Sequence, residues 1–272
     1  MSWARFRRSR IAVVAIAYVV IVLIIAIVAP LIAPDPNAVD IAHRLQSPDA
    51  LHRLGTDDLG RDVLARLIFG ARVSLTVGLT ATAISLIVGS TLGAIAGYYG
   101  GVADWIISRL IEIVLCFPFL FIVLGIVALF RPSLWTIMIA LGLTSWTTEA
   151  RFLRGEFLRI RDIEVAQAAR ASGARDARII FRHLLPNALA PVLVSASFGV
   201  ASAILIESAL SFLGLGVPLP TASWGSILYA AEQYIDFAWW LLLFPGVAIF
   251  LTVAAFNIIG DRARESLDPR EE

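Results

Sequence analysis

The hydrophobic pattern of this chain consists mainly of long apolar stretches rather than the short alternations of a water-soluble fold. A helix needs about 20 apolar residues to cross a bilayer, and six stretches approach or exceed that length. We therefore predict transmembrane helices at residues 11–33, 73–98, 105–130, 133–150, 188–214 and 237–259. Pro118 lies inside the third stretch and predicts a kink there. The predicted fold class is all-α, with residues 1–272 in a single membrane domain.

Composition agrees with this interpretation. Hydrophobic residues make up 59% of the chain and the mean hydropathy is +0.84, whereas soluble domains are about 45–50% apolar with glycine included. A water-soluble globular protein is therefore excluded. The first stretch has the basic flank of a signal peptide, but it is long and no clear small-residue cleavage site follows it. We interpret it as an uncleaved membrane anchor.

The distribution of charge predicts the orientation of the helices. All 22 basic residues are arginines. Four lie at the N-terminus without any acid, eight in residues 151–182 and three in the C-terminal tail. The 34–72 loop has five arginines but six acidic residues, and the 217–236 loop has no arginine. Since basic loops stay in the cytoplasm, we expect both termini and the 151–187 loop to be cytoplasmic and the 34–72 loop to be extracytoplasmic. The net charge of +1 suggests no nucleic-acid partner.

Small residues repeat every four positions in the second predicted span. Gly89, Gly93 and Gly97 continue a stripe that begins with Ala81 and Ser85. Small side chains at this spacing lie on one helix face and let a neighbouring backbone approach closely. We therefore predict a helix-packing surface rather than a ligand site.

The 151–187 loop contains a charged segment with the pattern helix–glycine–helix. Asp162 can cap a helix that carries Glu164 in its first turn, and alanines follow up to Gly173. Glycine suits the left-handed position that ends a helix. We predict a second helix from Asp176 that stops by Pro186 and lies at the membrane surface through Ile179, Ile180 and Leu184.

This segment resembles the cytoplasmic loop of ABC importer permeases. That pattern has a Glu-Ala-Ala triplet, a glycine after three further residues, and a terminal Leu-Pro. Gln167, Ala168 and Ala169 occupy the triplet, with Gln167 in place of glutamate; Gly173 and Leu185-Pro186 match in spacing. His183 stands where an aliphatic residue is common, yet His183-Leu184-Leu185-Pro186-Asn187 is similar to the peptide-transporting branch.

The resemblance covers nearly the whole chain. The motifs similar to dipeptide and oligopeptide permeases, and within them to the C-type subunit, are Gly55-Thr56-Asp57-Asp58-Leu59-Gly60-Arg61-Asp62, Gly70-Ala71-Arg72-Val73-Ser74-Leu75, Leu210-Ser211-Phe212-Leu213-Gly214-Leu215-Gly216, Ser223-Trp224-Gly225 and Ala255-Phe256-Asn257 with Gly260-Asp261. Together these motifs are far more specific than any one of them alone.

The resemblance implies a type I importer in the bacterial plasma (inner) membrane. Its partners would be a homologous second permease, two ATPases and an extracytoplasmic binding protein. ATP and Mg would be used by the ATPases, because this chain has no phosphate-binding Gly-x-x-x-x-Gly-Lys loop; we expect no enzymatic activity and no bound cofactor. The residues expected to contact an ATPase are Glu164, Gln167, Ala168, Ala169, Arg170, Gly173, Leu185 and Pro186.

Charges inside predicted spans are candidates for function because burying them in hydrocarbon is costly. Glu207 can line the translocation path or form an interhelical hydrogen bond, and we favour the hydrogen bond. Arg109 and Glu112 are three residues apart, and we expect a local ion pair.

Other functions remain to be considered. A permease of the same family can carry nickel, an opine or another small solute. A secondary transporter driven by an ion gradient would show inverted repeats and several midplane charges, which are not evident. An intramembrane hydrolase would need a Ser–His pair or metal cluster at membrane depth, and His43, His52 and His183 all fall outside the predicted spans without metal-ligand spacing.

Overall fold

The computed structural model describes residues 9–131, 133–162, 167 and 171–267, and every regular element in this part of the chain is a helix. The long helices are α2 (Arg10–Ile32), α3 (Val63–Tyr99), α6 (Leu134–Ile160), α9 (Leu185–Phe212) and α11 (Trp239–Leu267). The shorter ones are α4 (Gly101–Cys116), α5 (Phe119–Leu129), α8 (Asp176–Arg178), the π-helix η2 (Ile179–Leu184), α10 (Trp224–Ala231) and the 3-10 helices η1 (Ile41–His43) and η3 (Glu232–Tyr234). The predicted all-α fold is confirmed for the described residues.

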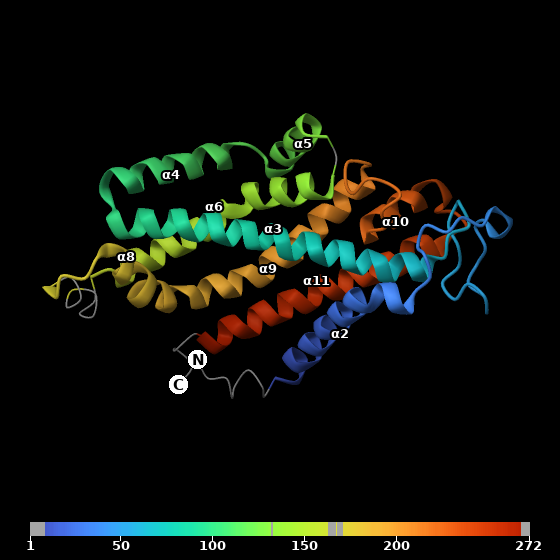
Figure 1. The fold of residues 1–272 in the computed structure, drawn as a ribbon, viewed down its shortest axis with the longest axis horizontal. Helices are drawn as coiled ribbons and strands as arrows, with labels where there is room; N and C mark the ends of the chain where they lie inside the picture. Colours follow the sequence, from blue (N-terminus) through green and yellow to red (C-terminus); the bar gives the residue numbers. More distant parts are fainter. Residues whose placement is uncertain (1–8, 132, 163–166, 168–170, 268–272) are drawn as a thin grey trace.

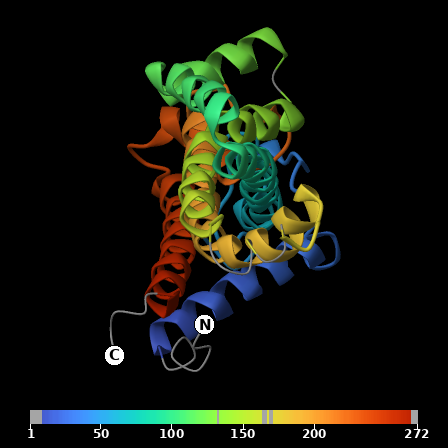
Figure 2. The same cartoon turned by 90° about the vertical axis from the view of Figure 1, so that its left-hand side faces the viewer.

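The long helices lie side by side along the long axis of the molecule (Figure 1). The segment between α2 and α3 lies at the same end as α10, whereas α2 begins and α11 ends on the side towards α8. Seen end-on, α3 and α6 lie between α4 on one side and α2 and α11 on the other (Figure 2). The centre of the fold is therefore the α3–α6 pair, with α9 packed against both.

The glycine stripe of α3 lies against α6. A Cβ atom added at Gly89 would lie 2.6 Å from the carbonyl oxygen of Trp146, and one at Gly93 would lie 2.5 Å from that of Ala150. At Gly97 the added atom would lie 2.5 Å from Phe157 Cβ. The prediction of a close helix-packing surface is confirmed for these three glycines, because no side chain larger than hydrogen fits between the two helices there. Ala81 and Ser85 of the same stripe line the cavity described below.

The third predicted span, 105–130, is broken at Pro118. Helices α4 and α5 meet there at 86°, since proline cannot continue the hydrogen-bond ladder of α4. The kink prediction is confirmed. The local ion pair is also confirmed: Arg109 Nη1 lies 2.6 Å from Glu112 Oε2, on an exposed face of α4.

Helix α3 begins at Val63, earlier than the predicted span of 73–98, so the loop that precedes it is shorter than 34–72. The Asp62 side chain accepts a hydrogen bond from Ala65 N at 2.8 Å and caps the helix. Arg66, in the first turns, is 1% exposed and lies 3.5 Å from the carboxylate of Asp57. The span predicted from hydropathy begins after these turns because it treats Arg66 as an unfavourable charge. Hydropathy does not show that the Asp57 carboxylate compensates the charge of this buried arginine.

Four of the described helices, α2, α3, α9 and α11, are long and apolar enough to cross a membrane, and the α4–α5 pair makes five if it counts as one span. Helix α6 contains the predicted span 133–150 and continues to Ile160, but it is not among them. Its middle is polar, with Thr144, Ser145, Thr147, Thr148 and Glu149. Helix α6 is an inner helix, since α3, α5 and α9 all pack against it.

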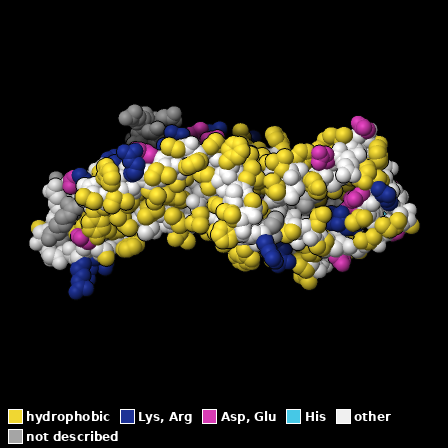
Figure 3. Space-filling view, turned by 90° about the horizontal axis from the view of Figure 1, so that it is seen from above, with side chains coloured by type: hydrophobic (Ala, Val, Ile, Leu, Met, Phe, Trp, Pro, Cys, Tyr) yellow, Lys and Arg dark blue, Asp and Glu magenta, His cyan; other side chains and the backbone are white. Residues whose placement is uncertain are grey.

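The outer surface of the bundle is largely apolar. Figure 3 shows hydrophobic side chains over much of the length of one face, with charged side chains mainly towards its ends. Exposed apolar residues include Ile27, Leu31, Val102, Phe121 and Leu129. Such a surface is stable in contact with lipid or another apolar surface rather than water.

Candidate functional site

The segment between α6 and α8 carries most of the residues predicted to contact an ATPase. Glu164, Ala168, Ala169 and Arg170 lie outside the described residues. Gln167 is exposed, and its Nε2 donates a hydrogen bond to the Asp162 carbonyl oxygen at 2.8 Å. Gly173 has φ +76°, so the predicted left-handed conformation is confirmed. No atom lies within 4 Å of the position a Cβ would take there.

The prediction that the second helix of this segment stops by Pro186 was wrong. Helix α8 runs directly into η2 and then into α9, which begins at Leu185. Leu185 N donates to Ile180 O, the hydrogen-bond spacing of a π-helix. Pro186 follows directly on this π-helical turn and has no backbone N–H to donate, yet α9 continues past it. Residues 176–187 and the predicted span 188–214 are therefore joined in one continuous helical path, which ends at Phe212.

The apolar side of this path packs on protein rather than on the membrane surface, which corrects a second expectation. Ile179 and Leu184 are fully buried and Ile180 is nearly so. They belong to a core cluster contributed by α3, α6 and α9, with Ala94, Tyr98, Leu153, Phe157, Ile160, Ala188 and Val192. Tyr98 Oη also donates to Asp176 Oδ1 at 2.7 Å. Residues 176–184 are thus attached to three of the central helices.

The hydrogen bond from Tyr98 gives a test of this attachment. Tyr98→Phe removes the donor but keeps the ring, so we expect a loss of stability of about 1–2 kcal/mol and a melting temperature lower by about 3–5 °C. Thermal unfolding of the purified protein in detergent measures this. Tyr99→Phe is the matched control because the Tyr99 side chain is exposed. Equal melting temperatures for Tyr98→Phe and wild type would contradict the role of this bond.

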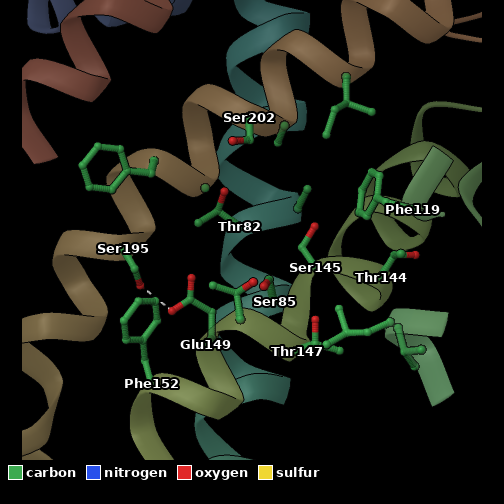
Figure 4. A pocket seen from close by; sticks show the side chains of 18 of the residues that line it. Thr82, Ser85, Phe119, Thr144, Ser145, Thr147, Glu149, Phe152, Ser195 and Ser202 are labelled. Atoms are coloured by element: carbon green, nitrogen blue, oxygen red, sulfur yellow. Dashed lines mark hydrogen bonds between the residues drawn. The ribbon is translucent and has the colours of Figure 1, made fainter. Parts of the chain in front are cut away.

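A cavity of about 980 Å³ lies between the central helices. Its walls come from α3, α6 and α9, from α4 and α5 around their break, and from Arg264 of α11. Figure 4 shows hydroxyl and carboxylate oxygens from three helices directed towards one region, with Phe119 and Phe152 at its sides. The hydroxyl residues in the walls are Thr82, Ser85, Thr144, Ser145, Thr147, Thr148, Ser195 and Ser202. A cavity of this size and mixed lining can hold a small organic molecule.

Glu149 is the acidic residue of this wall, and the sequence interpretation overlooked it. It lies in α6, is 5% exposed, and accepts a hydrogen bond from Ser195 Oγ of α9. The available signal was a carboxylate within a run of hydroxyl residues, at the polar end of a predicted span. That position looks like a span boundary in the sequence, but the continuation of α6 to Ile160 places Glu149 in the interior of the helix.

Glu207 lies elsewhere and is not in the wall of this cavity. It is fully buried and accepts hydrogen bonds from Ser211 Oγ at 2.8 Å and from Ser74 Oγ of α3 at 3.2 Å. Trp224 N, at the start of α10, donates in turn to Ser74 Oγ at 3.3 Å. These contacts match the interhelical hydrogen bond that we favoured for Glu207.

Among the described residues, no group of three or more His, Cys, Asp or Glu side chains is arranged to hold a metal ion. His43 and His52 approach each other, with ring centroids 5.6 Å apart. Each pairs with a carboxylate, His43 with Asp40 at 2.7 Å and His52 with Asp62 at 3.1 Å. The bond from His43 keeps the pKa of the Asp40 carboxyl below its ordinary value.

Two protein families match the chain. The family described as "Binding-protein-dependent transport system inner membrane component" matches residues 89–272, and "N-terminal TM domain of oligopeptide transport permease C" matches residues 1–48. The chain is 43% identical over 270 residues to the dipeptide transport system permease protein DppC of Alkalihalophilus pseudofirmus, covering 99% of this chain and 89% of that protein. It is 36% identical over 267 residues to the oligopeptide transport system permease protein OppC of Bacillus subtilis, covering 98% and 88%.

Solved structures show a similar fold. An inward-facing conformation of the MetNI methionine ABC transporter matches with a TM-score of 0.61 and 20% identity, covering 76% of this chain and 98% of that one. A second inward-facing crystal form of the same transporter matches with a TM-score of 0.59. At this level of identity the likeness concerns the fold.

Proposed function

The chain belongs to the family of binding-protein-dependent transport system inner membrane components, and from this premise we propose that it is the C-type permease subunit of an ATP-driven importer of di- or oligopeptides. The observation that carries the proposal is the near-full-length similarity to peptide permeases, at 36–43% identity. The chain is a multi-pass protein of the inner membrane.

We propose six membrane crossings, formed by α2, α3, the α4–α5 pair, α6, α9 and α11. Helix α6 is added to the five apolar spans: its polar middle faces the cavity, so it needs little contact with lipid. Both termini and residues 151–187 would be cytoplasmic. The arginine distribution supports this orientation, as does the position of α8 on the side where α2 begins and α11 ends.

Coupling to ATP hydrolysis would occur through the segment between α6 and α8. In this proposal, the helix from about Glu164 to Ser172 seats in a groove on one ATPase. Ala168 and Ala169 allow close approach, and Gln167 and Arg170 hydrogen-bond to the partner. Gly173 supplies the turn, and Leu185-Pro186 begins the helix that receives the motion. Attachment of residues 176–184 to α3, α6 and α9 supports this route into the membrane.

The partners would be a homologous second permease, two ATPases that use ATP and Mg, and an extracytoplasmic binding protein. ATP binding would draw the ATPases together and shift the permease pair between its two access states, a population shift driven by differential affinity for ATP. This chain would form half of the translocation path and catalyse no reaction itself.

Reconstitution tests the proposal. The chain, its sister permease, the ATPases and the binding protein are placed in proteoliposomes, and uptake of radiolabelled dialanine is measured with and without ATP. We expect uptake that needs ATP and falls to background when this chain is omitted. Uptake of nickel or an opine in place of the peptide would contradict the assigned substrate. Transport by this chain alone, driven by an ion gradient, would contradict the importer.

A further inference from the structure

One carboxylate oxygen in the cavity lacks a protein partner. Glu149 Oε2 accepts the hydrogen bond from Ser195, but no described residue donates to Oε1. Protein atoms do not fully enclose Oε1, and Glu149 lines the cavity, so this oxygen is open to the cavity. In Figure 4 the Glu149 side chain lies among Thr82, Ser85 and Ser195, at the wall of this space.

The charge of Glu149 is also uncompensated within the described part of the chain. Arg264 of α11 lines the same cavity, but neither it nor any other arginine or histidine there forms an ion pair with Glu149. In contrast, Glu156 of the same helix pairs with Arg159. A carboxylate at membrane depth without a cation is costly. A ligand that carries a positive charge into the cavity would supply the missing partner, and this would favour its binding.

The remaining wall indicates what kind of cation fits. Hydroxyl groups from α3, α6 and α9 lie in the same wall as the carboxylate. Those of Thr144 and Ser145 donate to carbonyl oxygens of their own helix and can accept from peptide amides. Apolar surface comes from Phe117, Phe119, Phe152 and Phe198. A short peptide with a free N-terminus presents the complementary groups: one ammonium, backbone amides and side chains of variable polarity. The cavity volume of about 980 Å³ is large enough for such a molecule.

We propose that the protonated amino terminus of the transported peptide binds to Glu149 within this cavity, and that Glu149 makes this permease half selective for solutes with a free amine. The proposal rests on the proposed function and names a substrate contact for it. It also assigns different roles to the two partners of one hydrogen bond: Glu149 binds the solute, and Ser195 positions its carboxylate.

A purely structural role for Glu149 makes a different prediction. If the Ser195–Glu149 bond served only to hold α6 against α9, removing either partner would lower stability and transport alike. Glu149→Gln keeps an acceptor for Ser195 and removes the charge, whereas Ser195→Ala keeps the charge and removes the hydrogen bond. Glu156→Gln is the matched control, because it removes a charge from the same helix outside the cavity.

The test uses the complete reconstituted transporter and two peptides, dialanine and N-acetyl-dialanine. Each rate is divided by the wild-type rate for the same peptide, which cancels the selectivity of the binding protein. We expect Glu149→Gln to lower dialanine uptake about tenfold and to leave the uptake of N-acetyl-dialanine close to the wild-type rate for that peptide. Glu149→Asp should recover most of the loss. Ser195→Ala removes only the positioning hydrogen bond, so it should lower dialanine uptake less than Glu149→Gln does. Glu156→Gln should change uptake less than about threefold.

Three results would overturn the inference while wild-type peptide transport stands: unchanged dialanine uptake in Glu149→Gln, equal losses for both peptides, or equal losses in Glu149→Gln and Ser195→Ala. If Glu149→Gln fails to assemble, Ser145→Lys replaces it. This residue lies one helical turn from Glu149 in the same wall, so its ammonium would occupy the carboxylate. Dialanine uptake should then fall about tenfold, and full uptake would overturn the inference. Absence of peptide uptake in the wild type would instead contradict the proposed function.

Discussion

Replacing Gly173 with tryptophan should abolish peptide uptake while leaving membrane insertion intact. Two features of the structure support this expectation. Gly173 has φ +76°, a conformation that a bulky residue adopts only with strain. The space around it is open, so an indole would project from the surface proposed to meet an ATPase. Coupling energies between sites are typically about 1–3 kcal/mol, and we expect uptake to fall by about tenfold or more.

The measurement is ATP-dependent dialanine uptake in proteoliposomes, with the amount of inserted protein determined in the same vesicles. Gly173→Asn is the matched control, since asparagine tolerates the left-handed conformation and adds little bulk. It should retain most of the activity. Co-purification of the ATPases with each variant shows where the defect lies: we expect Gly173→Trp to lose them. Normal uptake by Gly173→Trp would rule out the seating of this segment on a partner.

Replacing Gly93 with leucine should separate α3 from α6 and strongly destabilise the fold. An added Cβ would lie 2.5 Å from the carbonyl oxygen of Ala150 and 3.0 Å from its Cα. Backbone atoms cannot rotate away as a flexible side chain can, so the helices must move apart. Overpacking of this kind costs about 3 kcal/mol or more. In a protein of this size we expect a melting temperature lower by about 10 °C.

Gly246→Leu is the control for this experiment. Gly246 is also a glycine of a long apolar helix, but no atom lies within 4 Å of its added Cβ. It should leave the melting temperature within about 2 °C of wild type. Both variants are compared by thermal unfolding in the same detergent. Equal stability of Gly93→Leu and Gly246→Leu would show that close contact along α3 is not what holds α6 in place.

Several features of the fold were predictable from the sequence because they depend on local chemistry. Proline removes a backbone donor, and the break at Pro118 was predicted on that ground. The residue type alone does not decide this, because α9 and α11 continue past Pro191 and Pro245. The spacing of Gly89, Gly93 and Gly97 puts them on one face of any helix, and close packing follows. Gly173 was assigned its left-handed conformation on similar grounds.

The candidate site was less predictable because its members come from different helices. Glu149 is a candidate because it accepts a hydrogen bond from Ser195, 46 positions away in the sequence, and because it lines a cavity whose walls come from six helices. The hydroxyl residues that precede Glu149 were the available signal, but its position also fits a charge at the end of a span. Likewise, Ile179 and Leu184 form an apolar side that suits a membrane surface or a protein core equally well, and the pattern cannot separate the two.

By itself, the sequence determined that this protein is helical, lies in a membrane and carries a charged segment between two apolar stretches, because hydropathy and residue spacing act along the chain. The tertiary structure decided which polar groups are buried together. It placed Glu207 in a closed set of hydroxyl partners and Glu149 at an open cavity, although each is a glutamate within or at the edge of a predicted span. Burial and partnership depend on neighbouring helices, and helix packing is a property of the whole chain.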